Sequence, residues 1–245
     1  MGKRFIISDI HGSFLAFKQC LERCSFNYEE DELIVNGDVV DSFPESKECV
    51  DLILSLKNYV YIIGNHCIWA RDYFNSDCNM AVASGTWLEH GGLATIASYK
   101  DGVPESHKQF FNDAKPYYVT KDNKLIIHAG YKPGVPLSSE HLAYYVFNRD
   151  LVEAAIKALR NDQAFNLPDF DEVFVGHTPT IRYFPEPRPV RVGNLYMIDT
   201  GAGFDGVLTI MDIDSKKYWQ SDQVMRLYPD HKGRNKHSYN ELNKL

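Results

Sequence analysis

The amino-acid sequence predicts an α/β sandwich, and three observations support that fold class. Five short apolar runs rich in Ile and Val are each bounded by Gly or Asn, a pattern typical of buried strands. Segments with helical periodicity lie between them, and this alternation favours an α/β architecture. The chain of 245 residues is 44% hydrophobic and 13% aromatic, which supplies a core and excludes disorder over most of its length.

The strands are expected at the apolar runs. In chain order these are residues 5–7, 33–35, 60–63, 125–127 and 173–175. Two later runs, Leu195–Asp199 and Gly206–Asp212, have no helix between them, so we expect the second sheet to be antiparallel. The segment 185–191 holds three prolines in five residues. These remove backbone donors and exclude a central strand or a helix there.

Three helices are expected between the strands. Residues 14–24 carry apolar side chains at helical spacing and follow Ser13, which suits a helix N-cap. Residues 45–56 follow Pro44, a residue that favours a first helical turn, and residues 151–159 form the third helix. The aromatic side chain of Trp87 is expected to pack in the core, as is that of Trp69, for which a place lining a pocket near His66 is the alternative.

The chain is expected to form one domain over residues 1–228, because no linker or repeat interrupts it, followed by a polar, mobile tail at 229–245. Its formal net charge of −7 and pI near 5.7 argue against general nucleic-acid binding and against an anionic membrane as partner. Five cysteines without a CxxC pair indicate reduced thiols. No apolar stretch reaches the ~18 residues of a membrane span. We therefore expect a cytoplasmic protein, with its oligomeric state left open.

Side chains that can bind metal ions follow five successive strand ends, where α/β proteins place reactive groups. They are Asp9, His11, Asp38, Asp41, Asn65, His66, His128 and His177. Taken singly, each is better explained as a turn residue or a hydrogen-bonded histidine. Taken together, they form an oxygen and nitrogen donor set that suits Mn, Fe, Zn or Ni better than Ca or Mg. The set is large enough for two ions about 3.5–4 Å apart, the arrangement used in phosphoryl transfer.

Five motifs in this order resemble the calcineurin-like metallophosphoesterases. They are residues 9–12 (DIHG), 37–41 (GDVVD), 64–66 (GNH), 128–130 (HAG) and 176–179 (GHTP). Residues 146–150 and 198–202 extend the resemblance to the phosphoprotein phosphatase branch, which includes phage protein phosphatases and symmetrical diadenosine tetraphosphate hydrolases. The resemblance covers residues 4–213 and implies a β-sandwich of two mixed sheets flanked by helices.

The resemblance also implies a role for each site residue and two divalent ions, with manganese as the first choice. The implied metal ligands are Asp9, His11, Asp38, Asn65, His128 and His177, with Asp38 shared by both ions. His66 would protonate the leaving oxygen, and Asp41 would orient the His66 imidazole. Arg149 and Asn65 would bind the phosphate. A hydroxide that bridges the two metal ions would attack phosphorus directly, without a covalent enzyme intermediate.

The first functional hypothesis is a Ser/Thr-type protein phosphatase that hydrolyses phosphomonoesters, because residues 147–149 and 199–201 most resemble that branch. The partner would be a phosphorylated protein or a nucleotide. The alternative is a symmetrical diadenosine polyphosphate hydrolase. A second alternative is a phosphate-binding or regulatory protein with weakened activity, because an arginine usual in the family is absent after Asp41.

Three positions depart from the family pattern. Ser42 replaces that arginine, which usually contacts phosphate, Cys67 replaces an acid, and His90 stands where many relatives have Asn. Cys67 is expected to be a packed thiol. Other cations near the motifs are either solvated surface charges or substitutes for the missing guanidinium. They are Arg71, Arg182, Arg188 and Arg191.

Overall fold

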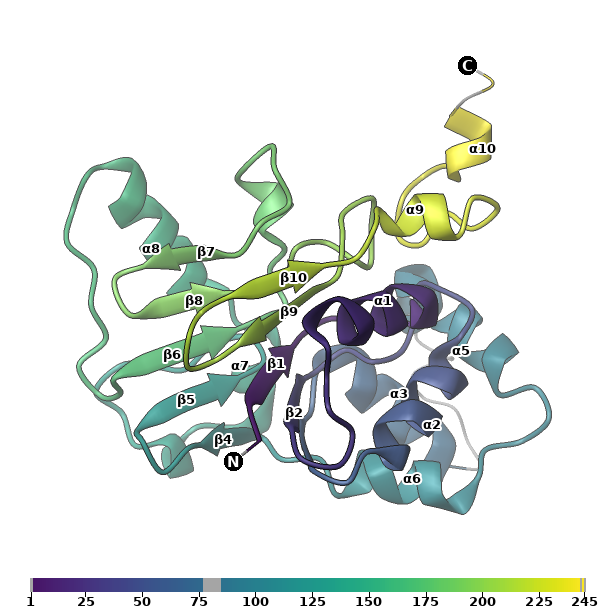
Figure 1. Cartoon of the computed structure of the whole chain (residues 1–245), viewed down its shortest axis with the longest axis horizontal. Coiled ribbons are helices and arrows are strands. Elements are labelled where there is room, and N and C mark those ends of the chain that lie inside the picture. Colours follow the sequence, from purple (N-terminus) through teal and green to yellow (C-terminus); the bar gives the residue numbers. More distant parts are fainter. Residues whose placement is uncertain (1, 77–84, 243, 245) are drawn as a thin grey trace.

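Two five-stranded sheets form the centre of the protein (Figure 1). This computed structural model describes residues 2–76, 85–242 and 244. In spatial order the first sheet comprises β10 (Tyr218–Gln220), β9 (Thr209–Asp212), β1 (Arg4–Ile7), β2 (Glu32–Asn36) and β3 (Tyr59–Ile62). The second comprises β4 (Tyr117–Val119), β5 (Lys124–Ile127), β6 (Glu172–Val175), β8 (Leu195–Met197) and β7 (Val190–Val192).

The apolar runs form strands that are buried on both faces, which explains why they lack polar alternation. Along β1, Ile6 belongs to a cluster between the sheets, whereas Phe5 and Ile7 belong to the cluster on the helical side. Successive strand side chains point to opposite faces, so each central strand supplies both clusters. The cluster between the sheets also contains Ile34 and Phe174 from β2 and β6.

Helices cover the outer faces of both sheets (Figure 1). The longer ones are α1 (Phe14–Cys24), α2 (Ser46–Ser55), α3 (Asn65–Asn75), α6 (Glu105–Asn112) and α8 (Asp150–Arg160). Shorter ones are α5 (Leu93–Ser98), α7 (Leu142–Phe147), α9 (Val224–Leu227) and α10 (Tyr239–Leu242), with a π-helical turn η1 (Leu88–Gly92) and 3₁₀ turns η2 (Leu137–Ser139) and η3 (Thr180–Arg182). The three helices expected from the sequence correspond to α1, α2 and α8.

Strand direction brings the motif-bearing loops together. Strands β1, β2 and β3 run parallel in the first sheet, and β5, β6 and β8 run parallel in the second. A hydrogen bond joins the carboxyl ends of β2 and β5, one from each sheet. The side-chain amide of Asn36 donates to the carbonyl of Ile127 at 3.1 Å. The loops that follow β1, β2, β3, β5 and β6 therefore meet at one edge of the sandwich.

The predicted class, two mixed sheets flanked by helices, is confirmed, but an antiparallel second sheet is wrong. Its centre is parallel, and only β4 and β7 at its edges run antiparallel to their neighbours. The two late runs lie in different sheets, since β8 pairs with β6 and β9 pairs with β1. Apolar composition predicts a strand but does not identify its partner. The proline-rich segment ends in β7, an edge strand, where prolines are tolerated.

The cysteines of the described residues are reduced and buried: Cys20, Cys24, Cys49 and Cys67 are free thiols. Cys78 lies outside the described residues. Within the described part of the chain, no helix combines the length and the apolar character needed to cross a bilayer.

Candidate active site

All eight candidate residues lie at the shared edge of the two sheets. Asp9 and His11 follow β1, Asp38 and Asp41 follow β2, Asn65 and His66 open α3 after β3, His128 follows β5 and His177 follows β6. Each of these side chains is buried. The structure therefore brings together every polar group that the sequence places at a strand end.

The backbone at this edge takes a conformation that non-glycine residues rarely adopt. Positive φ angles occur at Asp9, His11, Asp38, Asp41, Ser42 and His177, between 37° and 76°. Short polar residues tolerate this region better than branched ones, but it still carries strain, and such strain gathers at functional sites. Gly37 also has a positive φ, and a Cβ there would overlap the imidazole of His128. Only glycine allows that ring to approach.

Asp38 is the centre of two groups of metal-ligand atoms. One group is Asp38, His11 and His66, the other is Asp38, His128 and His177, and within each group the ligand atoms lie within 4.8 Å of one another. The Oδ2 of Asp38 is 3.3 Å from Nε2 of His128 and 4.0 Å from Nε2 of His11. A shared carboxylate between two imidazole-containing groups fits two ions.

Backbone carbonyls hold two of these imidazoles with Nε2 facing Asp38. The Nδ1 of His11 lies 3.1 Å from the carbonyl oxygen of Val40, and Nδ1 of His128 lies 3.1 Å from that of Asn36. A hydrogen bond from Nδ1 fixes the tautomer in which Nε2 is free to bind a cation. Asn65 adds an amide oxygen 3.2 Å from Nε2 of His128. The residues present thus fit a metal pair in type and in orientation.

Asp9 lies beside the two groups rather than within them. Its carboxylate accepts hydrogen bonds from the backbone amide of His177, at 3.1 Å to each oxygen, and from the Ser8 hydroxyl. Asp9 follows a strand of the first sheet and His177 one of the second, so this contact joins the two sheets. Burial raises the pKa of the Asp9 carboxyl, as does the charge of Asp38.

The electrostatics of the site favour neutral imidazoles at His11 and His177 and a charged imidazole at His128. Burial, with the positive charge of neighbouring histidines, lowers the pKa of His11 well below its usual range and that of His177 to about 2. Burial also disfavours charge on His128, but its ion pair with Asp38 outweighs this and raises its pKa to about 9. The carboxylates therefore stabilise positive charge at the position where the ligand atoms converge.

His66 is held by a buried network around Asp41. Its Nδ1 donates to Oδ2 of Asp41 at 2.6 Å. The same carboxylate accepts from the indole Nε1 of Trp87 at 3.0 and 2.8 Å and from the hydroxyl of Thr95 at 2.6 Å. Trp87 is a core residue, as expected, but its contact with Asp41 was not predictable, since 46 residues separate the two. Thr95 gave no sequence signal either.

A cavity of about 270 Å³ opens onto His66 and His177. Trp69 lines it, with its ring 5.0 Å from that of His66 and 5.8 Å from that of Phe147. Trp69 is half-buried: it packs against the core, as expected, and also lines this cavity. Trp69 lies one helical turn after His66 on α3, so the two side chains share a face of that helix. His90 lines the same cavity.

Three arginines line the cavities at the site. Arg149, Arg234 and His177 line both the cavity just described and a neighbouring one of about 350 Å³, to which Arg182 also belongs. The Nε of Arg149 is buried without a partner, and burial lowers the pKa of Arg149, as do the charges of Arg182 and Arg234. The ion pairs that arginines form elsewhere in the described chain are those of Arg4, Arg23, Arg71 and Arg188.

Arg234 reaches the site from the segment 229–245 through a tight turn. Its backbone amide donates to the carbonyl of Gly203 at 3.0 Å, and its guanidinium stacks 4.6 Å from the ring centroid of Phe204. Gly233 has a φ of 56°, and a Cβ there would lie 2.7 Å from the Phe43 ring. The segment described from the sequence as a polar tail therefore supplies a cation to the active-site cavity. The domain boundary at residue 228 stays a prediction.

The three arginines that follow His177 divide into two kinds. Arg182 lies at the site. Arg191 stacks 5.2 Å from the ring centroid of Tyr196 and donates to the carbonyl of Gly193 at 2.8 Å, at the edge of the second sheet. Arg188 is exposed and lies 3.9 Å from Glu186. Among the described residues, neither Arg188 nor Arg191 lines the two site cavities, which favours surface charges over substitutes for the missing guanidinium.

Two departures from the family pattern have a structural explanation. Ser42 is buried, with its hydroxyl 3.4 Å from Nδ1 of His11, and it lines a separate cavity beside Gly91 and Gly233. Cys67 is fully buried and accepts a hydrogen bond from the amide of Val39 at 3.4 Å. Burial raises the pKa of its thiol to about 12, so Cys67 is a packed thiol and not a nucleophile.

Comparison with known proteins agrees with this geometry. The family model described as calcineurin-like phosphoesterase matches residues 3–180. The asymmetrical bis(5′-nucleosyl)-tetraphosphatase PrpE of Anoxybacillus flavithermus is 27% identical over 229 residues, spanning 84% of this chain and 88% of that protein. A crystal structure provisionally named a diadenosine tetraphosphatase superposes with a TM-score of 0.65 at 17% identity, covering 89% of this chain and 92% of the other.

Among solved structures, a protein serine/threonine phosphatase from Saccharomyces cerevisiae has the same fold, with a TM-score of 0.53 at 14% identity and coverage of 91% and 77%. The family match spans well over half of the chain and includes all eight candidate residues, with His177 just inside its end. Two groups of ligand atoms that share Asp38 fit the ion pair used in metal-dependent phosphoester hydrolysis. The chain belongs to the calcineurin-like phosphoesterase family and is a phosphoester hydrolase.

Proposed function

We propose that this hydrolase cleaves dinucleoside polyphosphates at a pair of divalent ions, with Mn as the preferred metal and Fe, Zn and Ni as alternatives. The donor set of carboxylate, amide and imidazole groups supports this choice. Ions bound there polarise the phosphoryl group and lower the pKa of a water molecule. The ligands would be Asp9, His11, Asp38, Asn65, His128 and His177. The reduced thiols of the described cysteines fit a cytoplasmic enzyme.

His66 would supply the proton for the leaving oxygen. Its Nδ1 is bonded to Asp41, so Nε2 is the nitrogen left to face the substrate. As the oxygen of a hydroxide, formed when water releases a proton to solvent, bonds to phosphorus, the bond from phosphorus to the leaving oxygen would break. The leaving oxygen would take the proton from Nε2, and His66 would regain one from solvent. Asp41 is a positioning residue in this scheme, because it touches His66 and not the reacting atoms.

The observation that carries the substrate proposal is the arginine set at the cavities. Among the described residues, the arginines with a carboxylate within 4.0 Å are Arg4, Arg23, Arg71 and Arg188, so Arg149, Arg182 and Arg234 lack one, although the chain has a net charge of −7. A guanidinium binds phosphate through paired hydrogen bonds, and a polyphosphate chain offers a phosphate for each. The rings of Trp69 and Phe147 offer a surface on which a nucleobase can stack. The relatives named bis(5′-nucleosyl)-tetraphosphatases support the same substrate class.

Hydrolysis of phosphoserine or phosphothreonine in proteins is the second candidate, and the His66–Asp41 pair favours it. A serine alkoxide needs a proton to leave, whereas a phosphate leaving group scarcely does. An enzyme that hydrolyses only polyphosphates has less need of a buried proton donor. In this chain the Asp41 carboxylate that pairs with His66 also accepts hydrogen bonds from Trp87 and Thr95. The two candidates share one site and differ in what the arginines bind.

The deciding experiment compares diadenosine tetraphosphate with a phosphoserine peptide, using protein stripped of metal and reloaded with Mn²⁺. We expect kcat/KM to be at least about tenfold higher for the dinucleotide, as one lost charge-assisted contact implies. Chromatography of the products separates symmetrical cleavage, which yields two ADP, from asymmetrical cleavage, which yields ATP and AMP. A preference for the peptide would establish the second candidate. Failure on both substrates and on p-nitrophenyl phosphate would favour the binding or regulatory role.

A further inference from the structure

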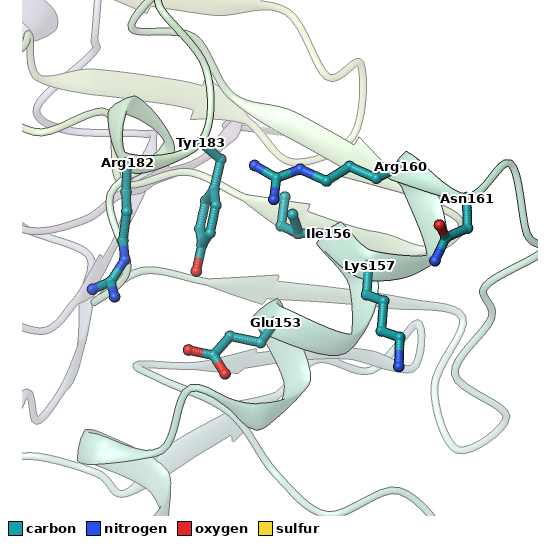
Figure 2. Close-up of a pocket in the computed structure, with 7 residues that line it drawn as sticks. All are labelled: Glu153, Ile156, Lys157, Arg160, Asn161, Arg182 and Tyr183. Atoms are coloured by element: carbon teal, nitrogen blue, oxygen red, sulfur yellow. The ribbon is translucent and has the colours of Figure 1, made fainter.

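A separate cavity of about 340 Å³ lies between α8 and the residues that follow η3 (Figure 2). Its charged lining is mainly basic, with Lys157 and Arg160 from α8 and Arg182 from η3 against a single acid, Glu153. This volume lies within the range of small-molecule sites. In a chain with an excess of acidic residues, such a cavity is a candidate anion site.

Arg182 connects this cavity to the metal-ligand cluster. It lines the cavity of Figure 2 together with Arg160, and it also lines the neighbouring cavity together with Arg149 and His177. The neighbouring cavity has one acidic lining residue, Asp205, against three arginines. A polyphosphate bound at His177 could therefore continue past Arg149 and Arg182. Its far end would then reach α8.

The polar groups in the cavity suit a nucleotide better than a bare phosphate. The Arg160 guanidinium lies 5.7 Å from the ring centroid of Tyr183, and the two side chains are adjacent in Figure 2. The hydroxyl of Tyr183 is buried without a hydrogen-bond partner. Such a group loses free energy until a ligand pairs with it. Glu153 and Asn161 can accept hydrogen bonds from ribose hydroxyls, whereas an inorganic anion would only be repelled by Glu153.

We propose that the cavity between α8 and Tyr183 binds the distal nucleoside phosphate of a dinucleoside polyphosphate whose scissile phosphate lies at the Asp38 cluster. Arg182 and Arg160 bind its phosphate, and Tyr183, Asn161 and Glu153 face its sugar. This inference rests on the proposed function, because it assigns a second subsite for the same substrate.

The test uses the full-length Mn²⁺-loaded enzyme and four variants. Arg160→Ala removes one cation of the cavity, Arg160→Lys keeps its charge, and Tyr183→Phe removes the unpaired hydroxyl. Arg188→Ala is the matched control, because Arg188 is an exposed arginine that does not line the cavity. KM and kcat are measured for diadenosine tetraphosphate and for p-nitrophenyl phosphate, which is too small to reach the subsite.

We expect Arg160→Ala to raise KM for diadenosine tetraphosphate about tenfold, with Arg160→Lys intermediate and KM for p-nitrophenyl phosphate changed less than about twofold. Tyr183→Phe should raise KM for the dinucleotide alone and leave the free energy of unfolding equal or higher. An unchanged KM in Arg160→Ala, or an equal rise in Arg188→Ala, would overturn the subsite while leaving the proposed function intact.

Binding of α,β-methylene-ADP, which resists hydrolysis between its phosphorus atoms, separates the subsite from the function. If the wild-type enzyme fails to cleave diadenosine tetraphosphate, the proposed function is wrong. Calorimetry with α,β-methylene-ADP then decides the subsite. Affinity that falls about tenfold in Arg160→Ala supports it, and equal affinity in both proteins overturns it.

Discussion

Thr95→Val tests whether the buried network around Asp41 holds the proton donor in place. The Thr95 hydroxyl donates to Oδ1 of Asp41 at 2.6 Å and accepts from the Asp41 amide at 2.9 Å. Valine has nearly the same shape but lacks both bonds, so the change isolates the hydroxyl. Thr95 is fully buried, so its hydroxyl is not in contact with bulk water.

The expected loss follows from the partners involved. A hydrogen bond to a buried charged group contributes about 1.5–3 kcal/mol. The Asp41 amide keeps a second acceptor, the Ser46 hydroxyl at 3.3 Å. Losing the bond from that amide to Thr95 therefore adds little to the decrease in stability. We therefore expect the free energy of unfolding to fall by about 2 kcal/mol. For a domain of this size that corresponds to a decrease in Tm of about 4–8 °C.

Urea unfolding gives the stability change, provided the slope of free energy against urea is unchanged. Thr95→Ser is the control, because it keeps the hydroxyl and loses one methyl group, which costs about 0.8 kcal/mol. Turnover is measured in parallel on phosphoserine and p-nitrophenyl phosphate. A loosened Asp41 should lower kcat about three- to tenfold on phosphoserine and less on the nitrophenyl ester. Equal unfolding free energies for the Val and Ser variants would refute the argument.

Four further outcomes are expected. Asp38→Asn should abolish bound metal and activity together, measured by elemental analysis and turnover, and full activity with stoichiometric metal would contradict the sharing of Asp38. His66→Asn should slow phosphoserine hydrolysis far more than nitrophenyl phosphate hydrolysis at unchanged metal content, whereas equal losses would exclude a proton donor. Arg234→Ala should raise KM for diadenosine tetraphosphate about tenfold, and an unchanged KM would assign Arg234 to packing on Phe204. Because burial raises the pKa of Cys67 to about 12, its thiol should resist iodoacetamide at pH 8 in the native protein and react in urea, as peptide mass mapping would reveal.

The sequence predicts the strands and their end loops well because both are local signals. The runs around Ile6, Ile34 and Phe174 are buried on two faces, and each is followed by residues that tolerate a sharp change of direction. Sheet membership is not local. The chain between β8 and β9 crosses from the second sheet to the first. No local pattern in residues 198–208 predicts that the next strand, β9, will pair with β1.

The candidate site divides in the same way. The eight strand-end residues are predictable because parallel strands place their carboxyl ends at one edge. The contacts of Trp87 and Thr95 with Asp41 were missed because they are hydrogen bonds across the fold, made by residue types that are ordinary in a core. Arg234 was missed because its segment is polar and aperiodic, and only the turn at Gly233 brings it against Phe204.

The left-handed backbone of the site limits where its chemistry can be transplanted. Six non-glycine residues at positive φ, at about 1 kcal/mol each, store strain comparable to the whole net stability of a typical domain. A peptide carrying the same motif would relax to extended or helical backbone and disperse its ligands. Two interlocked sheets and the Asp9–His177 contact between them maintain the geometry. The strand-end loops therefore keep their geometry only within this fold. Grafting them onto another scaffold requires both sheets.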